Sequence, residues 1–300
     1  MSLNIFKSIK HASFSFFKEA ISLTFLAVKK ILNNNNDKIL SVYFHNPSPE
    51  IFESAIRYMA GKSYSFLSVS SFEKILNNAT TPDSPFAIIT IDDGFRDNIG
   101  LLEVINRYGV PVTIFVTSSA IEEGNFWFEY VIASRDKPSA VLFDEIVRIK
   151  RMPAEDYYSR ISELKRSRRL ERSALTIEEL VNISREEYIT IGSHSVSHIS
   201  LPGKSVEVQR KELTESKKIL EYWTRKEVDY FSYPSGDFGE EQRRIVRECG
   251  YRLAFSTETK PIDIEKVDRF SIPKRCVNDD AGYFETLAKI SGAWDYFMKR

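Results

Sequence analysis

Short apolar runs alternate with amphipathic stretches along the chain from residue 39 onward. The apolar runs have the length of buried strands, and they occupy residues 39–44, 86–91, 111–116, 189–191, 230–233 and 253–255. The stretches with helical periodicity lie between them, at residues 71–76, 98–108, 177–183 and 206–223. Strands that alternate with helices pair in parallel, and the helices pack outside the sheet or barrel. The pattern therefore predicts an α/β fold built around one barrel.

The composition narrows the class of protein. Apolar residues make up 42% of the 300 residues and charged residues 28%, which is typical of a soluble globular chain. The 42 basic side chains are balanced by 42 acidic ones, whereas proteins dominated by nucleic-acid binding are far more basic. Two cysteines, Cys249 and Cys276, are too few for a disulfide framework. We therefore expect a globular protein with no nucleic-acid partner.

Residues 1–37 are interpreted as a separate N-terminal segment. Lysines outnumber the single acid, Glu19, before residue 37, and apolar residues recur at the spacing of an amphipathic helix. The apolar stretch is shorter than the ~20 residues that a membrane span needs, and no small-residue cleavage site follows it. We expect this helix to pack on the following domain of a cytoplasmic protein. Peripheral contact between the helix and a membrane surface is the alternative.

Residues 38–300 are predicted to form the barrel, with two additions. The stretch from about 125 to 175 breaks the alternation of strands and helices, and we interpret it as a helical insertion. Nine basic and four acidic side chains lie within residues 148–172. The insertion thus presents either a solvated basic face or a patch for anionic lipid or a diphosphate-linked substrate. Apolar residues at helical spacing predict a closing helix at about 281–299.

Two adjacent carboxylates follow one of the predicted strands. The apolar run that ends at Ile91 leads directly into Asp92, Asp93 and Gly94. The carboxyl ends of parallel strands are where α/β proteins hold their active sites. Because adjacent residues on an extended strand point to opposite faces, the two acids are suited to different tasks, such as binding a metal and accepting a proton. An ordinary turn after a strand is the alternative.

A pair of histidines follows a later strand. His194 and His198 are four residues apart, so on a helical turn they would share one face and could share one cation. The chain has only four histidines, which makes a packing role for this pair the weaker alternative. With Asp93 they supply two nitrogens and one oxygen, the ligand set of a catalytic zinc-type site with a position open for water.

The strand that ends near Ser232 is followed by a turn with its own chemistry. Pro234 restricts the turn, Gly236 permits close approach of the backbone, and the main-chain N–H of Tyr233 could be presented to an oxyanion.

Taken in order, three segments resemble the first three motifs of the polysaccharide deacetylases, the NodB-like family 4 carbohydrate esterases. These segments are 90–94 (TIDDG), 194–198 (HSVSH) and 233–236 (YPSG). Residues 42–45 (VYFH) are similar to the first strand of that domain, and residues 175–180 are similar to the family's approach to its histidine motif. The resemblance covers roughly residues 38–278.

The resemblance implies a distorted (β/α)7 barrel and metal-dependent removal of an N-acetyl or other N-acyl group from an amino sugar. Asp92 would be the general base, and Asp93, His194 and His198 would bind the metal, most simply Zn²⁺, with Co²⁺ or Ni²⁺ as alternatives. The metal would polarise the amide and acidify its water, and the Tyr233 amide would help to hold the oxyanion. The implied substrate is an N-acetylated glycan or its lipid-linked precursor.

The chain departs from the family pattern at three places. No histidine follows His198, the late Asp-Trp motif is missing, and Ser232 stands where many relatives have an arginine that orients the base. We therefore take His45 as the candidate acid, with a pocket-lining or core role as the alternative. Arg275 is the candidate replacement for the orienting arginine, with a surface charge as the alternative.

Family members that act in exopolysaccharide or lipopolysaccharide assembly depart from the family pattern in similar ways. These relatives also carry an aromatic segment like residues 126–130, so Trp127 could stack on a sugar ring, although burial under the insertion is the simpler role.

Three functions compete on this evidence. The first is a metal-dependent deacetylase of a surface polysaccharide or of its lipid-linked precursor. The second is a deformylase or amidohydrolase for a small nucleotide- or lipid-linked compound, which the basic insertion favours if the substrate carries phosphate. The third is a non-catalytic glycan-binding relic, against which the complete set of Asp92, Asp93, His194 and His198 argues. The sequence makes no prediction of the oligomeric state.

Overall fold

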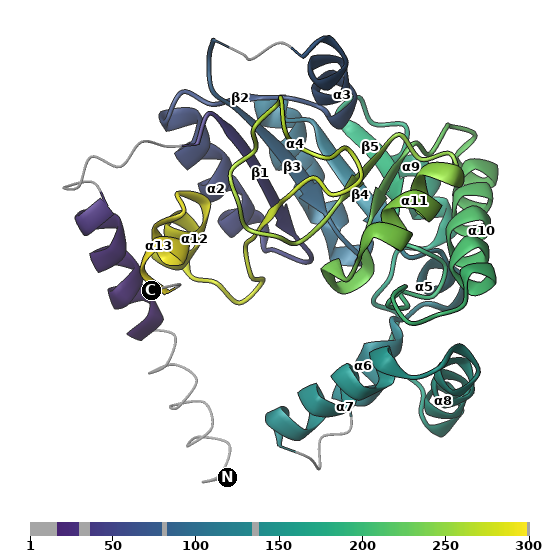
Figure 1. Cartoon of the computed structure of the whole chain (residues 1–300). Coiled ribbons are helices and arrows are strands. Elements are labelled where there is room, and N and C mark those ends of the chain that lie inside the picture. Colours follow the sequence, from purple (N-terminus) through teal and green to yellow (C-terminus); the bar gives the residue numbers. More distant parts are fainter. Residues whose placement is uncertain (1–16, 30–36, 80–82, 134–137, 299–300) are drawn as a thin grey trace, which may run out of the picture.

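The computed structural model describes residues 17–29, 37–79, 83–133 and 138–298. A curled sheet of parallel strands lies at its centre, with helices on the outside (Figure 1). The strands are β1 (Ile39–Phe44), β2 (Ser65–Phe66), β3 (Phe86–Ile91), β4 (Val112–Val116), β5 (Ile189–Ser193), β6 (Tyr230–Ser232), β7 (Leu253–Phe255) and β8 (Arg275–Cys276). Their order is β7-β6-β5-β4-β3-β1-β8, and β2 pairs with β3. The expected α/β fold, a distorted (β/α)7 barrel, is confirmed.

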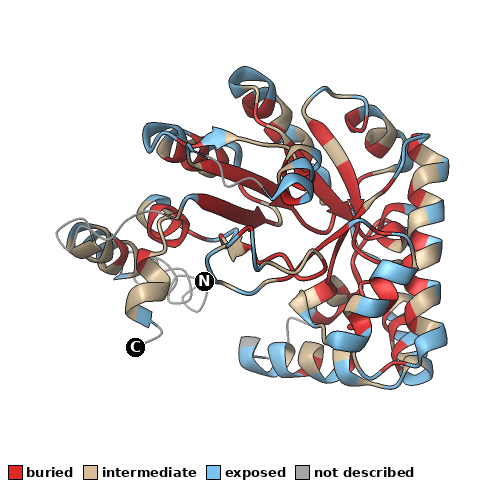
Figure 2. Cartoon of the chain, turned by 45° about the horizontal axis from the view of Figure 1, so that its top comes forward, coloured by how far each residue is buried: buried red, intermediate tan, exposed pale blue. Residues whose placement is uncertain are grey.

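The central strands are buried on both faces, as Figure 2 shows in red. Every residue of β1, β3 and β4 is buried, which agrees with their near-continuous apolar sequences. The register pairs Phe44 with Ile91 and Val116 with Ser193, so neighbouring strands end at the same level. Residues that follow these strands are therefore gathered at one edge of the sheet.

The helices around the sheet begin and end where local chemistry predicts. They are α2 (Pro49–Gly61), α3 (Val69–Asn78), the 3₁₀ helix η1 (Arg96–Leu101), α4 (Leu102–Tyr108), α5 (Ser118–Glu123), α9 (Ile177–Ile183), α10 (Val206–Thr224) and α11 (Glu240–Glu248). Thr176 and Glu179 form a capping box at the start of α9. Gly109 takes a positive φ of 60° and ends α4, a left-handed conformation that glycine adopts without steric cost.

Three helices occupy the stretch where the insertion is expected. They are α6 (Trp127–Ile132), α7 (Ser139–Arg151) and α8 (Ala154–Ser167), and Figure 1 shows them on one side of the barrel. Tyr157, Ile161 and Leu164 form the buried face of α8. Arg160 of α8 pairs with the buried Glu145 of α7 at 2.8 Å, which ties these two helices together.

The N-terminal helix packs against the C-terminal helices. Residues 17–29 are helical, and the rest of the predicted segment 1–37 lies outside the described residues apart from residue 37. Glu19 accepts hydrogen bonds from the amides of Phe284 and Glu285 (2.9 Å each), and Phe25 stacks on Phe297 at 4.7 Å. The helix therefore caps the first turn of the helix that follows Gly282. Within the described ranges, no helix has both the length and the apolar character needed to cross a membrane.

The single closing helix predicted at about 281–299 is two helices. They are α12 (Tyr283–Ile290) and α13 (Ala293–Met298), and the chain turns between them at Gly292, whose φ is +74°. A left-handed residue ends a helix, so the apolar periodicity continues across a break that it does not reveal.

Candidate metal centre and active site

Five of the predicted site residues converge at the carboxyl edge of the sheet: Asp92, Asp93, His194, His198 and His45. They surround a cavity of about 350 Å³. Its polar lining comes from Asp92, Asp93, His194, His198, His45, Lys150, Ser235, Thr257 and Asp279, and its apolar lining from Tyr43, Phe95, Phe128, Phe143 and Ile146. Asp92 and Asp93 follow β3, the histidine pair follows β5, and His45 follows β1.

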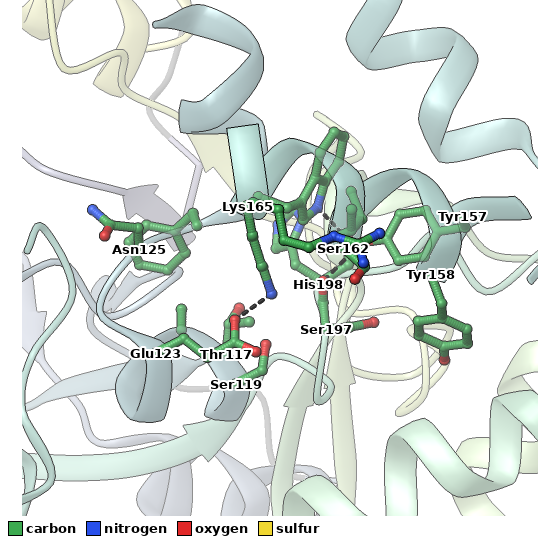
Figure 3. A pocket seen from close by; sticks show the side chains of 15 residues that line it. Thr117, Ser119, Glu123, Asn125, Tyr157, Tyr158, Ser162, Lys165, Ser197 and His198 are labelled. Atoms are coloured by element: carbon green, nitrogen blue, oxygen red, sulfur yellow. Dashed lines mark hydrogen bonds and ion pairs between the residues drawn. The ribbon is translucent and has the colours of Figure 1, made fainter. Parts of the chain in front are cut away.

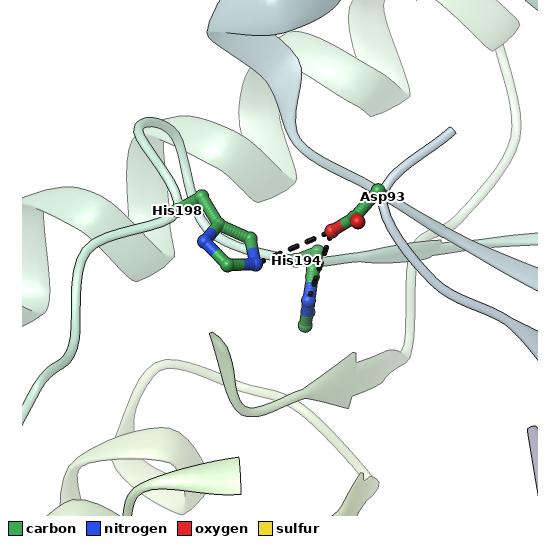
Figure 4. Close-up of side chains that lie close together, drawn as sticks. All are labelled: Asp93, His194 and His198. Carbon is green, nitrogen blue, oxygen red and sulfur yellow. Dashed lines mark ion pairs between the residues drawn. The ribbon is translucent and has the colours of Figure 1, made fainter. Parts of the chain in front are cut away.

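Asp93, His194 and His198 form a compact buried cluster (Figure 4). Asp93 Oδ1 lies 3.2 Å from His198 Nε2 and 3.5 Å from His194 Nε2. One ligand atom from each of the three residues lies within 4.8 Å of the others. The buried Asp93 Oδ1 has no hydrogen-bond partner among the described residues. Two imidazole nitrogens and a carboxylate oxygen suit a divalent transition metal such as Zn²⁺, so these residues fit the implied ion.

The protonation of the cluster also suits a metal. His194 Nδ1 lies 2.7 Å from the Ser232 carbonyl, which leaves Nε2 for a cation. Burial lowers the pKa of His194 to about 4, so this imidazole is neutral near pH 7. Burial acts to raise the pKa of Asp93, but the neighbouring imidazoles, His198 foremost and then His45, outweigh it and hold the pKa below its ordinary value. Metal ligation requires a neutral imidazole and an ionised carboxylate.

The prediction that His194 and His198 lie on one helical turn is wrong. Residues 194–198 form a loop in which Ser195 and His198 have positive φ angles of 64° and 57°. Glu212 of α10 holds this loop, because its carboxylate accepts the amides of Val196 and Ser197 at 2.9 Å each. The two imidazoles meet through this loop conformation and not through helical spacing. Nothing near residue 194 in sequence points to Glu212.

Lys274 is the principal site residue that the sequence did not reveal. Its ammonium donates to both oxygens of Asp92, at 2.6 and 2.7 Å, and to Ser232 Oγ at 2.8 Å. Ser232 Oγ in turn donates to Asp92 Oδ2 at 3.2 Å. The lysine is 1% exposed; burial lowers its pKa, and the contact with Asp92 opposes that shift. The ammonium of Lys274, the residue just before β8, therefore holds Asp92 in place.

A sequence profile described as polysaccharide deacetylase matches residues 79–254. The chain belongs to the polysaccharide deacetylase family.

This family member is similar to one known protein in sequence and to two solved structures in fold. Bacillus subtilis (strain 168) YxkH, whose name places it among the polysaccharide deacetylases, is 22% identical over 208 residues. The match covers 69% of this chain but only 57% of YxkH. The Streptococcus pyogenes deacetylase PplD, solved in complex with acetate, superposes with a TM-score of 0.60 at 18% identity, over 85% of this chain and 98% of PplD. IcaB from Ammonifex degensii superposes with a TM-score of 0.61 at 14% identity, over 86% and 98%.

Lys274, and not Arg275, contacts the predicted base in this polysaccharide deacetylase. The Arg275 guanidinium bonds instead to Asp37 (3.1 Å), Asp295 (3.2 Å) and the Ile290 carbonyl (2.8 Å). These contacts join the C-terminal helices to the edge of the barrel. The contact predicted for Arg275 is thus made by the residue before it. Adjacent residues of an extended segment face opposite sides, so only one of the two points toward Asp92.

The Tyr233 amide is not available to an oxyanion. It donates to the Phe255 carbonyl at 3.0 Å, and the Tyr233 hydroxyl donates to the Phe270 carbonyl. Pro234 is buried and outside the set that lines the cavity. Ser235 lines the cavity instead, with a φ of +61° and a buried hydroxyl that has no partner among the described residues.

Trp127 does not line the cavity with the metal cluster. Its side chain is 3% exposed, and its indole N–H donates to the His198 carbonyl at 3.4 Å. The next residue, Phe128, lies in the cavity wall, with its ring 5.6 Å from that of His198. An aromatic surface is thus present, but Phe128 provides it, while Trp127 supports the loop that carries His194 and His198.

His45 is held on the cavity wall by its backbone. The carboxylate of Asp279 accepts the amides of His45 (3.2 Å) and Asn46 (2.8 Å), and Asn98 donates to the His45 carbonyl at 3.0 Å. The imidazole packs edge-on against Tyr43, 5.3 Å between ring centres. His45 and the cluster line the same cavity, which leaves it as the candidate acid.

Proposed function

We propose that this protein is a metal-dependent hydrolase that removes the N-acetyl group from an amino sugar of a surface polysaccharide. The observation that carries the proposal is the buried cluster of Asp93, His194 and His198 beside Asp92 in one open cavity. A ligand set with an adjacent carboxylate base is what amide hydrolysis requires. Membership of the polysaccharide deacetylase family supports the substrate class.

The residues of the cavity account for the proton transfers of this reaction. A divalent cation bound by the cluster would polarise the amide carbonyl and acidify water. Asp92 accepts a proton as the water oxygen adds to the acetyl carbon, and Lys274 holds the carboxylate in place. Protonated His45 gives its proton to the departing amine as the C–N bond breaks. The products are acetate and the free amino sugar, and transfer of the proton from Asp92 through solvent restores the protonated His45.

The experiment that tests this function is a measurement of acetate release. The purified chain is supplied with Zn²⁺, Co²⁺ or Ni²⁺ and with N-acetylglucosamine oligosaccharides. Release that depends on the added ion, and that a chelator removes, is the expected result. His194→Ala is the matched control for the metal cluster. No metal-stimulated release from any acyl substrate would overturn the proposal.

Replacing His45 by glutamine is expected to lower kcat for N-acetyl substrates by about 10²-fold, because general acid catalysis of amine departure is lost. Hydrolysis of p-nitrophenyl acetate is expected to be unchanged, since p-nitrophenolate departs without a proton. Steady-state rates on the two substrates measure this difference. Equal losses on amide and ester would contradict the assignment of His45 as the acid.

A second candidate function is supported by the α7 side of the cavity. Lys150 lines the cavity, and its ammonium forms no ion pair with another described residue. Burial lowers its pKa, and Asp237 and Asp93 oppose that shift. Phe143 on the same helix is 65% exposed. A cation beside an apolar surface suits a phosphate-linked amphiphile, that is, a deformylase or deacetylase acting on a lipid-linked sugar. Faster turnover of a diphosphate-linked sugar than of the free sugar would favour it.

A further inference from the structure

A second cavity lies next to the metal cluster, between α5, α6 and α8 (Figure 3). Its volume is about 490 Å³, within the range of ligand-binding pockets. The residues that surround it are Thr117, Ser119, Ala120, Glu123, Asn125, Phe126, Trp127, Tyr157, Tyr158, Ile161, Ser162, Lys165, Arg166, Ser197 and His198. None of the functional assignments above uses this space. His198 belongs to the walls of both cavities, so the two adjoin at this side chain.

The lining combines aromatic rings with hydroxyl groups. Trp127 and Tyr157 are buried, with ring centres 5.8 Å apart, and Tyr158 follows with 41% of its surface exposed. Thr117 is 2% exposed, and its hydroxyl oxygen has no hydrogen-bond partner among the described residues. An unpartnered buried hydroxyl favours a ligand or water that completes its hydrogen bond. The accessible ring of Tyr158 beside such hydroxyls suits a ligand that has both apolar C–H faces and polar groups.

The charges of this cavity are largely compensated. Lys165 pairs with Glu123, and Figure 3 shows this pair on the opposite side of the cavity from the two tyrosines. Beyond these two residues and His198, the remaining lining residue with a basic or acidic side chain is Arg166, which is exposed. A neutral, hydroxyl-rich ligand leaves the Lys165–Glu123 pair in place.

The aromatic wall is joined directly to the metal-binding loop. The Tyr157 hydroxyl donates to the Ser197 carbonyl at 2.8 Å, and the Tyr158 hydroxyl donates to Glu212 at 2.7 Å. Glu212 is the carboxylate that holds the amides of residues 196 and 197. A ligand packed on the Tyr158 ring is therefore held at a fixed position relative to His198.

We propose that this second cavity binds a neutral sugar unit of the same glycan chain whose N-acetyl group enters the metal cavity. The inference rests on the proposed function, because it assumes that the substrate is a glycan with more than one sugar. It adds a specificity site: the cavity selects oligomers over single sugars and places the chain relative to the metal cluster.

Ser162 offers a way to fill the cavity without substituting a residue of the metal cluster. It lies on α8 with its residue exposed, and Ser159 lies on the same helix, exposed and outside the cavity lining. Ser162→Trp is therefore the blocking variant and Ser159→Trp is its matched control. Thr117→Val is a second variant, which removes the unpartnered hydroxyl with little change of shape.

The test measures binding separately from catalysis. N-acetylglucosamine oligomers of one to six units, β-1,4- and β-1,6-linked, are titrated calorimetrically into protein that carries Asp92→Asn. We expect Ser162→Trp to weaken binding of the longer oligomers about tenfold or more and to leave binding of the monosaccharide unchanged. We expect Thr117→Val to weaken oligomer binding severalfold and Ser159→Trp to have no effect. Zn²⁺ titration and thermal unfolding check that the variants fold.

The outcomes separate this inference from the proposed function. Oligomer affinity that is equal to monosaccharide affinity, or that is unchanged in both Ser162→Trp and Thr117→Val, overturns the second sugar site. Length-dependent binding that Ser162→Trp removes supports the site even if the parent protein releases no acetate. In that case the deacetylase assignment fails alone, and the cavity remains a glycan-binding site.

Discussion

Asp92→Asn is expected to lower kcat for N-acetyl substrates by about 10²–10⁴-fold, the contribution typical of a positioned general base. The amide keeps the size of the carboxylate, and its single oxygen can still accept from Lys274 and Ser232, but its NH2 group loses the second contact with Lys274 and it cannot take the proton of water. Acetate release measures the loss. Calorimetric titration with Zn²⁺ is expected to show unchanged metal affinity, because Asp93, His194 and His198 remain.

Asp83→Asn is a matched control for this prediction. Asp83 is an exposed acid just before the amino end of β3, the strand whose carboxyl end carries Asp92. Its substitution is expected to leave the rate unchanged. If Asp92→Asn released acetate as fast as the parent protein, the assignment of Asp92 as the base would be refuted.

Lys274→Met is expected to lower both stability and activity. Removing the ammonium leaves the Asp92 carboxylate buried and without its cation, and breaking a buried ion pair in this way costs about 3–5 kcal/mol of the free energy of unfolding. The freed carboxylate is also expected to lose its position, which reduces kcat by about 10²-fold. Denaturant unfolding and acetate release measure the two effects.

Two further variants test this prediction, one at a surface lysine as a control and one that compensates for the lost ammonium. Lys266→Met removes a lysine whose side chain is 81% exposed, and it is expected to change stability by no more than about 0.5 kcal/mol. Ser232→Arg, added to Lys274→Met, supplies a guanidinium from β6 to the same carboxylate and is expected to restore part of the rate. A purely structural role for Lys274 predicts restored stability without restored kcat, which would count against the positioning role.

Asp92, Asp93 and His194 could be located from sequence because each follows a strand directly, whereas His198 comes four residues later, on the loop that Glu212 holds. Asp92 and Asp93 come straight after β3, and His194 follows β5. Parallel strands in register bring such positions to one edge whatever the loops do, so local patterns were sufficient. His45 follows β1 in the same way and reaches the same cavity.

The corrected assignments concern positions one or two residues from the predicted ones. Lys274 acts at the base where Arg275 was expected, Phe128 lines the cavity in place of Trp127, and Ser235 does so in place of Tyr233. In each case the segment was identified correctly and the side chain was not. Neighbouring residues point in different directions, and which one faces the site depends on how the segment packs.

The order of strands and helices and the strand-end positions of the candidate site residues followed from the sequence alone, because apolar periodicity and strand ends are local properties of the chain, and the resemblance to the family implied the roles of these residues. The partner of Asp92, the support of the histidine loop by Glu212 and the second cavity were decided by the tertiary structure alone. Lys274 is 182 residues from Asp92, and the cavity is assembled from α5, α6 and α8. Contacts between segments so far apart depend on the packing of the whole barrel, which no local pattern encodes.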